Sequence, residues 1–146
     1  MLHEQTIAIS PEFNQFTLSD TGLPPESISA KPAGHMAMPA PGGALFFTNT
    51  DLAELSVRVE VWSAAPPGTK ATWDREVNLT ATFSTRRPTL ASVTPSPRDR
   101  RIELPHAGTY VLEARRNESL ARDSDFEIDY ILQNWLLRLW PEPRRT

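Results

Sequence analysis

The sequence predicts an all-β protein, a single antiparallel β-sandwich domain of jelly-roll-like type with about eight strands over residues 1–146. Apolar and polar residues alternate with a period of two in several segments, as they do in half-buried strands. Turn signals separate these segments. The chain also holds 14 prolines, which disfavour long helices and fall between the alternating segments. A chain of 146 residues fits one domain with a sizeable core.

The alternation is clearest in 55–61 and 77–83, which we predict to be strands with one apolar face. A short first strand is predicted from 5–9 and 13–18, with a bend at Pro11. Further strands are predicted at 44–48, 89–93, 101–104 and 108–115. Residues 19–43 are rich in proline and glycine and predict a long loop, in which a short strand near 35–38 could form.

The segment 123–140 carries two competing patterns. Apolar residues from Ile128 to Leu139 recur at helical spacing, and Ser124-Asp125-Phe126-Glu127 matches a helix capping box. The same segment is rich in aromatic residues, and Phe126, Ile128, Tyr130 and Leu132 also alternate with their neighbours as in a strand. Because the rest of the chain predicts a sandwich, we favour a strand over 125–140, which could carry a bulge at 133–134.

A run of acids and one tryptophan are the candidate partner-binding residues. On a strand, acids spaced by two would line one face as a ladder that mimics phosphates and steers a basic partner. A solvated strand face is the alternative. Trp62 falls on the polar phase of its strand and would project outward as an interface anchor, unless the 19–43 loop covers it. The predicted partner-binding residues are Trp62, Asp123, Asp125, Glu127 and Asp129.

The sequence predicts a protein that is not an enzyme and has no catalytic residues, metal or cofactor. There is no cysteine, and His3, His35 and His106 lack metal-ligand spacing. The run from Asp123 opens like a calcium loop but has Ile128 in place of the glycine and Asn134 in place of the closing glutamate. A Gly-x-Ser-x-Gly elbow and a glycine-rich phosphate loop are also missing.

Charge and the first residues bear on partners and location. The net charge of −3 and the pI near 5.6 argue against binding to nucleic acid or to an anionic membrane. No signal peptide is visible at the start, and the apolar-rich stretch 131–140 is too short and too polar to cross a bilayer. We therefore expect a cytoplasmic protein.

Four stretches resemble the competence protein J family and small actinobacterial β-sandwich proteins related to it. They are Ile7–Ser10 with Asn14–Leu18, Trp73–Val77, Ile102–Pro105 with Gly108–Leu112, and Trp135–Pro141. The resemblance implies a β-sandwich, and the name-giving member implies inhibition of a cognate nuclease. The matching residues include Gly108 for a tight turn and Tyr110 and Trp140 for packing, which are structural roles.

Together these observations predict a non-catalytic binding protein of immunity or inhibitor type that occludes a basic effector, such as a nuclease or toxin. The alternative is a structural or assembly module that forms a homo-oligomer through sheet edges or apolar faces. A third possibility is a small-ligand binder that uses the sandwich interior.

Overall fold

The computed structural model describes residues 1–11, 14–20, 36–48, 55–68, 72–92 and 99–143. Ten strands and no helix are found among these residues. The strands are β1 (His3–Ile9), β2 (Gln15–Ser19), β3 (Ala37–Ala40), β4 (Gly43–Phe47), β5 (Leu55–Val61), β6 (Arg75–Phe83), β7 (Thr89–Ala91), β8 (Arg100–Arg101), β9 (Gly108–Asp123) and β10 (Ile128–Pro141). The all-β prediction is confirmed, with ten strands in place of about eight.

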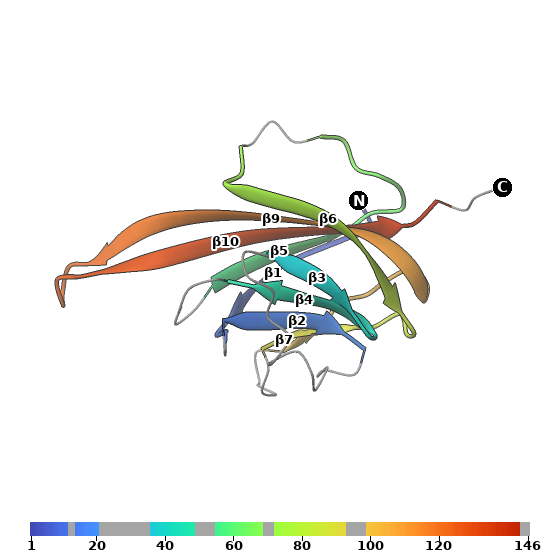
Figure 1. Cartoon of the computed structure of the whole chain (residues 1–146), viewed down its shortest axis with the longest axis horizontal. Helices are drawn as coiled ribbons and strands as arrows, with labels where there is room; N and C mark the ends of the chain where they lie inside the picture. Colours follow the sequence, from blue (N-terminus) through green and yellow to red (C-terminus); the bar gives the residue numbers. More distant parts are fainter. Residues whose placement is uncertain (12–13, 21–35, 49–54, 69–71, 93–98, 144–146) are drawn as a thin grey trace.

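The strands form two five-stranded sheets that lie one above the other (Figure 1). Sheet A has the order β1-β5-β10-β9-β6, and sheet B has the order β3-β4-β2-β7-β8. All neighbouring strands are antiparallel except β5 and β10, which run parallel at the centre of sheet A. The mostly antiparallel β-sandwich was thus predicted correctly, whereas its jelly-roll-like connectivity stays a prediction.

Aromatic rings join the facing sides of the two sheets. The ring of Phe16 on β2 lies 4.9 Å from that of Phe46 on β4 and 4.9 Å from that of Trp135 on β10. All three side chains are fully buried, and they belong to one core that also takes the inward valines of β5. The period-two patterns at 55–61 and 77–83 therefore reported correctly which side chains face this core.

The N-terminal half differs from the prediction in two places. The predicted bent first strand is two strands, β1 in sheet A and β2 in sheet B, so the chain changes sheets after Pro11. Within the predicted 19–43 loop, the short strand expected near 35–38 is found slightly later, as β3 at Ala37–Ala40, and it pairs with β4. Residues 21–35 of that loop lie outside the described residues.

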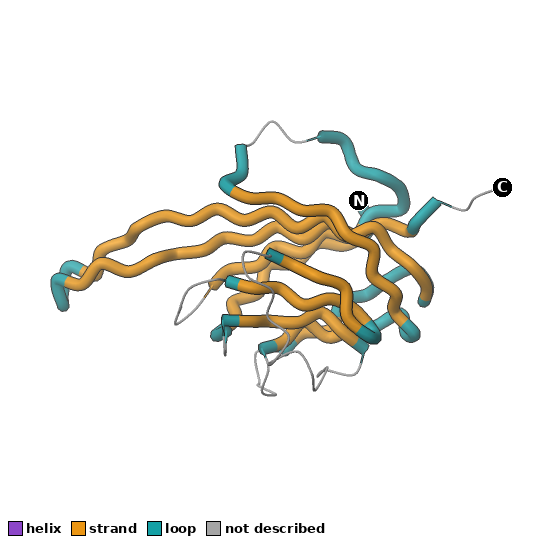
Figure 2. Tube along the Cα trace, viewed as in Figure 1, coloured by secondary structure: helices purple, strands orange, loops and turns teal. Residues whose placement is uncertain are grey.

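The C-terminal segment is a strand, as favoured over the helix, but it begins later than predicted, at Ile128. Its register with β9 is unbroken from Ile128↔Asp123 to Pro141↔Tyr110, so the suggested bulge at 133–134 is wrong. The strand β9 is longer than predicted and continues to Asp123. The two strands make a hairpin that extends well past the rest of the sandwich (Figure 1, Figure 2).

Candidate partner-binding site

The distal part of the β9–β10 hairpin, residues 119–132, projects as a two-stranded arm (Figure 2). Pairing of β6 with β9 ends at Arg75↔Arg116, and pairing of β5 with β10 ends at Ser56↔Asn134. Beyond these pairs, the arm has no neighbouring strand among the described residues. Residues 124–127 form the closing turn, in which Glu127 adopts a left-handed backbone conformation with φ of 52°.

Buried polar side chains fix the base of the arm to sheet B. The Arg116 guanidinium donates to the backbone carbonyls of Phe47 and Thr48, at 2.9 and 3.2 Å from Nη1. The Gln133 amide donates to the Thr48 carbonyl at 2.9 Å, and Trp135 Nε1 donates to Gln133 Oε1 at 3.0 Å. Burial lowers the pKa of the Arg116 guanidinium, which nevertheless remains charged. These bonds join the carbonyls of Phe47, the last residue of β4, and of Thr48, which follows it, to both strands of the hairpin.

A second contact holds the edge of β9 where the arm begins. The Asp74 carboxylate accepts from the Glu118 amide at 2.7 Å, and the Asp74 amide donates to Asn117 Oδ1 at 2.8 Å. The base of the arm is therefore held from the core and from the loop before β6. The direction in which the arm leaves the sandwich is set by these contacts.

The arm exposes large apolar side chains on both of its faces. Their exposed fractions are Leu120 78%, Phe126 72%, Ile128 57%, Tyr130 45%, Leu132 38% and Ile131 36%. Leu120 and Ile131 are register partners on the same face as the buried Trp135, which we call the core-side face. Tyr130 and its partner Ala121 lie on the other face, the outer face, together with Ile128 and Leu132. Exposed apolar side chains gathered in this way usually mark an interaction surface.

The arm also carries the net charge of the chain. It contains four acids and one arginine, a formal charge of −3 that equals the charge of the whole protein. Removing these five from the chain's 18 acidic and 15 basic residues leaves 14 of each. The excess negative charge of the chain is thus concentrated on the arm.

The four predicted acids surround the tip of the arm and do not line one strand as a ladder. Asp123 ends β9, Asp125 and Glu127 lie in the turn, and Asp129 follows in β10 opposite Arg122. The predicted ladder geometry is wrong because the segment turns at 124–127. The prediction that these acids bind a partner remains a prediction.

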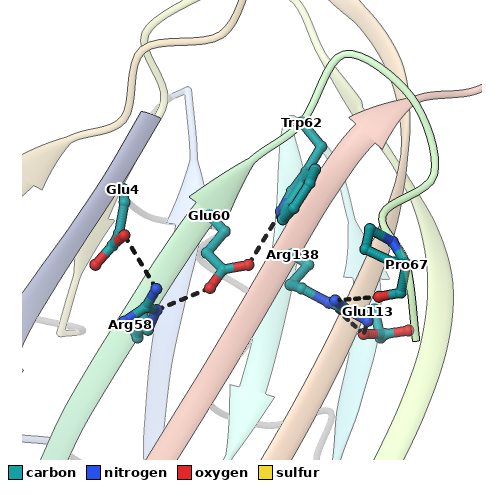
Figure 3. A network of polar contacts seen from close by, with 7 residues as sticks. All are labelled: Glu4, Arg58, Glu60, Trp62, Pro67, Glu113 and Arg138. Carbon is teal, nitrogen blue, oxygen red and sulfur yellow. Dashed lines mark hydrogen bonds and ion pairs between the residues drawn. The ribbon is translucent and has the colours of Figure 1, made fainter. Parts of the chain in front are cut away.

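Trp62 projects from the outer side of sheet A, as predicted from its phase. Its indole Nε1 donates to Glu60 Oε1 at 3.0 Å, and the side chain is half-buried (Figure 3). The Trp62 amide donates to the carbonyl of Leu139, near the end of β10 far from the tip. Leu139 and Asp129 are ten positions apart on β10, or about 33 Å. The structure therefore does not bring Trp62 together with the acids.

Ion pairs that sequence reasoning missed cross the outer side of sheet A (Figure 3). Arg58 bridges Glu4 and Glu60 at 3.0 and 2.8 Å. Further along, Arg138 pairs with Glu113 at 2.6 Å and donates to the Pro67 carbonyl at 3.1 Å. The period-two alternation predicts that these side chains lie on one side of the sheet. The sequence does not give the register of neighbouring strands, so it could not show which of them form ion pairs. Two arginines and three glutamates take part, so their charges largely cancel.

Within the described residues, no group of three or more His, Asp or Glu side chains could hold a metal ion. A shallow polar hollow of about 220 Å³ lies over β6 and β9, lined by Glu76, Val77, Asn78, Glu113 and Arg115. In the part of the chain that the structure describes, no helix is long and apolar enough to span a membrane.

Comparison of the sequence with protein-family models and with curated proteins gave no match. Comparison of the fold with solved structures gave two. One is ComJ from Bacillus subtilis, an inhibitor of the DNA-degrading activity of NucA, with a TM-score of 0.60, 15% identity and coverage of 96% of each chain. This chain has the ComJ fold. The second match is the product of crocagin biosynthetic gene J, with a TM-score of 0.58, 15% identity and coverage of 97% of this chain and 100% of that one. The ComJ-like β-sandwich that the sequence resemblance implied is confirmed.

Proposed function

We propose that this ComJ-like protein is a non-catalytic inhibitor that occludes a basic effector, most simply a nuclease. The observation that carries the proposal is the arm, in which all of the net negative charge and six exposed apolar side chains are combined. Acidic groups attract a basic partner and raise the rate of encounter, while apolar groups provide affinity once water is excluded. The fold shared with a nuclease inhibitor supports the same role.

Trp62 is a second predicted contact, distinct from the arm. A partner of ordinary interface size covers about 800 Å² of each protein, a patch about 32 Å across if it is round, so centred on the arm it would not reach Trp62. The arm is therefore the primary surface in this proposal, and Trp62 would contribute only to a partner large enough to reach both.

The proposal is tested with the nucleases encoded in the genome of the source organism, each purified separately. DNA hydrolysis is measured at increasing concentrations of this chain. We expect one nuclease to be inhibited to completion near a one-to-one ratio, and a chain with Asp123→Asn, Asp125→Asn, Glu127→Gln and Asp129→Asn to inhibit it poorly. If every nuclease retains full activity with an excess of the chain, the proposal is wrong.

The competing possibility is an assembly module that forms a homo-oligomer. Arms of equal negative charge repel each other, which disfavours association of two copies through the arms. Mass measurement in dilute solution separates the two functions: the inhibitor is expected to be a monomer at micromolar concentration, whereas an assembly module would be a dimer or larger.

A further inference from the structure

The arm differs from a flat recognition surface because it exposes apolar side chains on both faces. On the core-side face, Leu120 lies opposite Ile131, and on the outer face Tyr130 lies opposite Ala121. Phe126 is exposed in the turn that joins the two strands. A flat partner would cover one face and leave the other in water. A cleft covers both faces and the tip at once.

The charge of the arm indicates which kind of partner can bind it. A second copy of this chain and an anionic membrane would both bring negative charge against an arm of charge −3. A partner that covers the tip must instead complement the negative charge of Glu127, which lies in the turn beside Phe126. The chemistry of the arm therefore fits a basic protein whose cleft has apolar walls.

We infer that the arm inserts as a wedge into a cleft of a basic protein, with both faces in contact with the cleft walls and the acidic tip at its deep end. This inference rests on the proposed function and adds to it the shape of the partner's site. The paired part of the arm from Ile128 to Leu132 is five residues long, which corresponds to a depth of about 16 Å.

Hydrogen bonds at the base of the arm hold it in one direction, which favours insertion. Arg116 and Gln133 bind the carbonyl of Thr48 from both strands of the hairpin, and Asp74 holds the amide of Glu118. A ribbon held at its base in a set direction loses less conformational freedom on binding than an unsupported hairpin. A single direction of entry follows from the same contacts.

Site-specific photo-crosslinking tests the inference. Purified chains with Leu120→p-benzoylphenylalanine, on the core-side face, or Tyr130→p-benzoylphenylalanine, on the outer face, are irradiated in an extract of the source organism. Asn78→p-benzoylphenylalanine, on an exposed part of β6 away from the arm, is the matched control. Adducts are identified by mass spectrometry, and the attached peptides are located in the partner's sequence.

We expect both arm positions to label the same basic protein, on two different segments, at a yield about tenfold above the control, because benzophenone reacts only with groups in contact. Labelling from one face only, adducts with phospholipid or with a second copy of this chain, or yields no higher than the control would overturn the inference. If a nuclease is inhibited but only one face gives adducts, the wedge fails and the proposed function stands. If both faces label a basic protein without nuclease activity, the wedge stands and the nuclease-inhibitor proposal fails.

Discussion

The guanidinium of Arg116 lies over the indole ring of Trp135, 5.4 Å from its centroid, and the two residues are register partners on β9 and β10. This pair lies where the sandwich ends and the arm begins. A cationic group stacked on a buried indole gains from the electrostatic attraction of the ring, and here it also donates to two carbonyls of sheet B. The arm is thus anchored by a charged group inside the core.

Replacing this charged group should destabilise the whole domain. In Arg116→Met the buried carbonyls of Phe47 and Thr48 lose a donor, and we expect the free energy of unfolding to fall by about 2–3 kcal/mol. Urea unfolding followed by tryptophan fluorescence measures the change. Arg122→Met, on the exposed arm, is the matched control and should change stability by less than about 0.5 kcal/mol. Equal effects of the two substitutions would contradict the anchoring role of Arg116.

Loss of the buried Arg138–Glu113 ion pair should lower the stability of the protein more than loss of the exposed Arg58–Glu4 ion pair. The Arg138 side chain is 4% exposed, so Glu113→Ala leaves a buried charge without its nearest counter-ion. We expect a loss of about 3–5 kcal/mol, against less than about 1 kcal/mol for Glu4→Ala, whose carboxylate is exposed. Thermal unfolding of both variants provides the comparison, and a loss for Glu113→Ala as small as that for Glu4→Ala would contradict it.

Asp20 should make the stability of the domain sensitive to acid. Burial raises the pKa of its carboxyl, but hydrogen bonds from the side chains and amides of Ser84 and Thr85 outweigh burial and hold the pKa below its ordinary value of 3.8. A lowered folded pKa contributes stability that is present above the unfolded pKa and is lost as the pH falls through the folded pKa. The contribution is therefore present at neutral pH and declines below about pH 4.

The measurement is urea unfolding of Asp20→Asn at several values of pH. We expect Asp20→Asn to be less stable than the unchanged chain at pH 7 and to lose less stability on acidification to pH 3. Glu142→Gln, an equal charge change at an exposed position, should keep the acid dependence of the unchanged chain. If the stability of Asp20→Asn fell with pH as steeply as that of the unchanged chain, the charged Asp20 carboxylate would not be the source of the acid sensitivity.

The turn at the tip should tolerate glycine better than glutamate. Glu127 has φ of 52°, which costs a residue with a Cβ about 1 kcal/mol and glycine almost nothing. We expect Glu127→Gly to leave the stability unchanged or to raise it by up to about 0.5 kcal/mol, whereas Glu127→Gln should not raise it. Denaturant unfolding of the two variants decides the point. A loss of more than about 1 kcal/mol in Glu127→Gly would mean that the Glu127 side chain itself stabilises the turn.

The strands β5 and β6 were predictable because apolar and polar residues alternate in them, but the arm was only half predictable. The apolar residues Ile128, Tyr130 and Leu132 alternate as a strand that faces a core would, yet in the arm that pattern lies in solvent. The turn at 124–127 carries no glycine or asparagine at its left-handed position, so a usual hairpin signal is absent. The second half of β9, from Arg116 to Asp123, is mostly polar and gives no alternation that would extend the predicted strand.

The anchor of the arm could not be found from the sequence for a different reason. Arg116 and Gln133 are polar residues buried at the end of the core, where their partners are backbone carbonyls of Phe47 and Thr48. Backbone groups leave no pattern in side-chain identity. The separation of Trp62 from the acids was hidden likewise, because it depends on the parallel register of β5 and β10.

Charge reversal at the tip tests whether the acids of the arm attract the partner. A chain with Asp123→Lys, Asp125→Lys, Glu127→Lys and Asp129→Lys is compared with the unchanged chain for binding to the basic protein that the chain inhibits, by surface plasmon resonance at low and high salt. We expect association at low salt to slow by at least about tenfold, and the difference to shrink at high salt as the charges are screened. The control reverses four acids outside the arm (Glu4, Glu76, Glu103 and Glu142) and should associate much faster than the arm variant. Unchanged affinity and association rate in the arm variant would show that the acids of the arm take no part in binding.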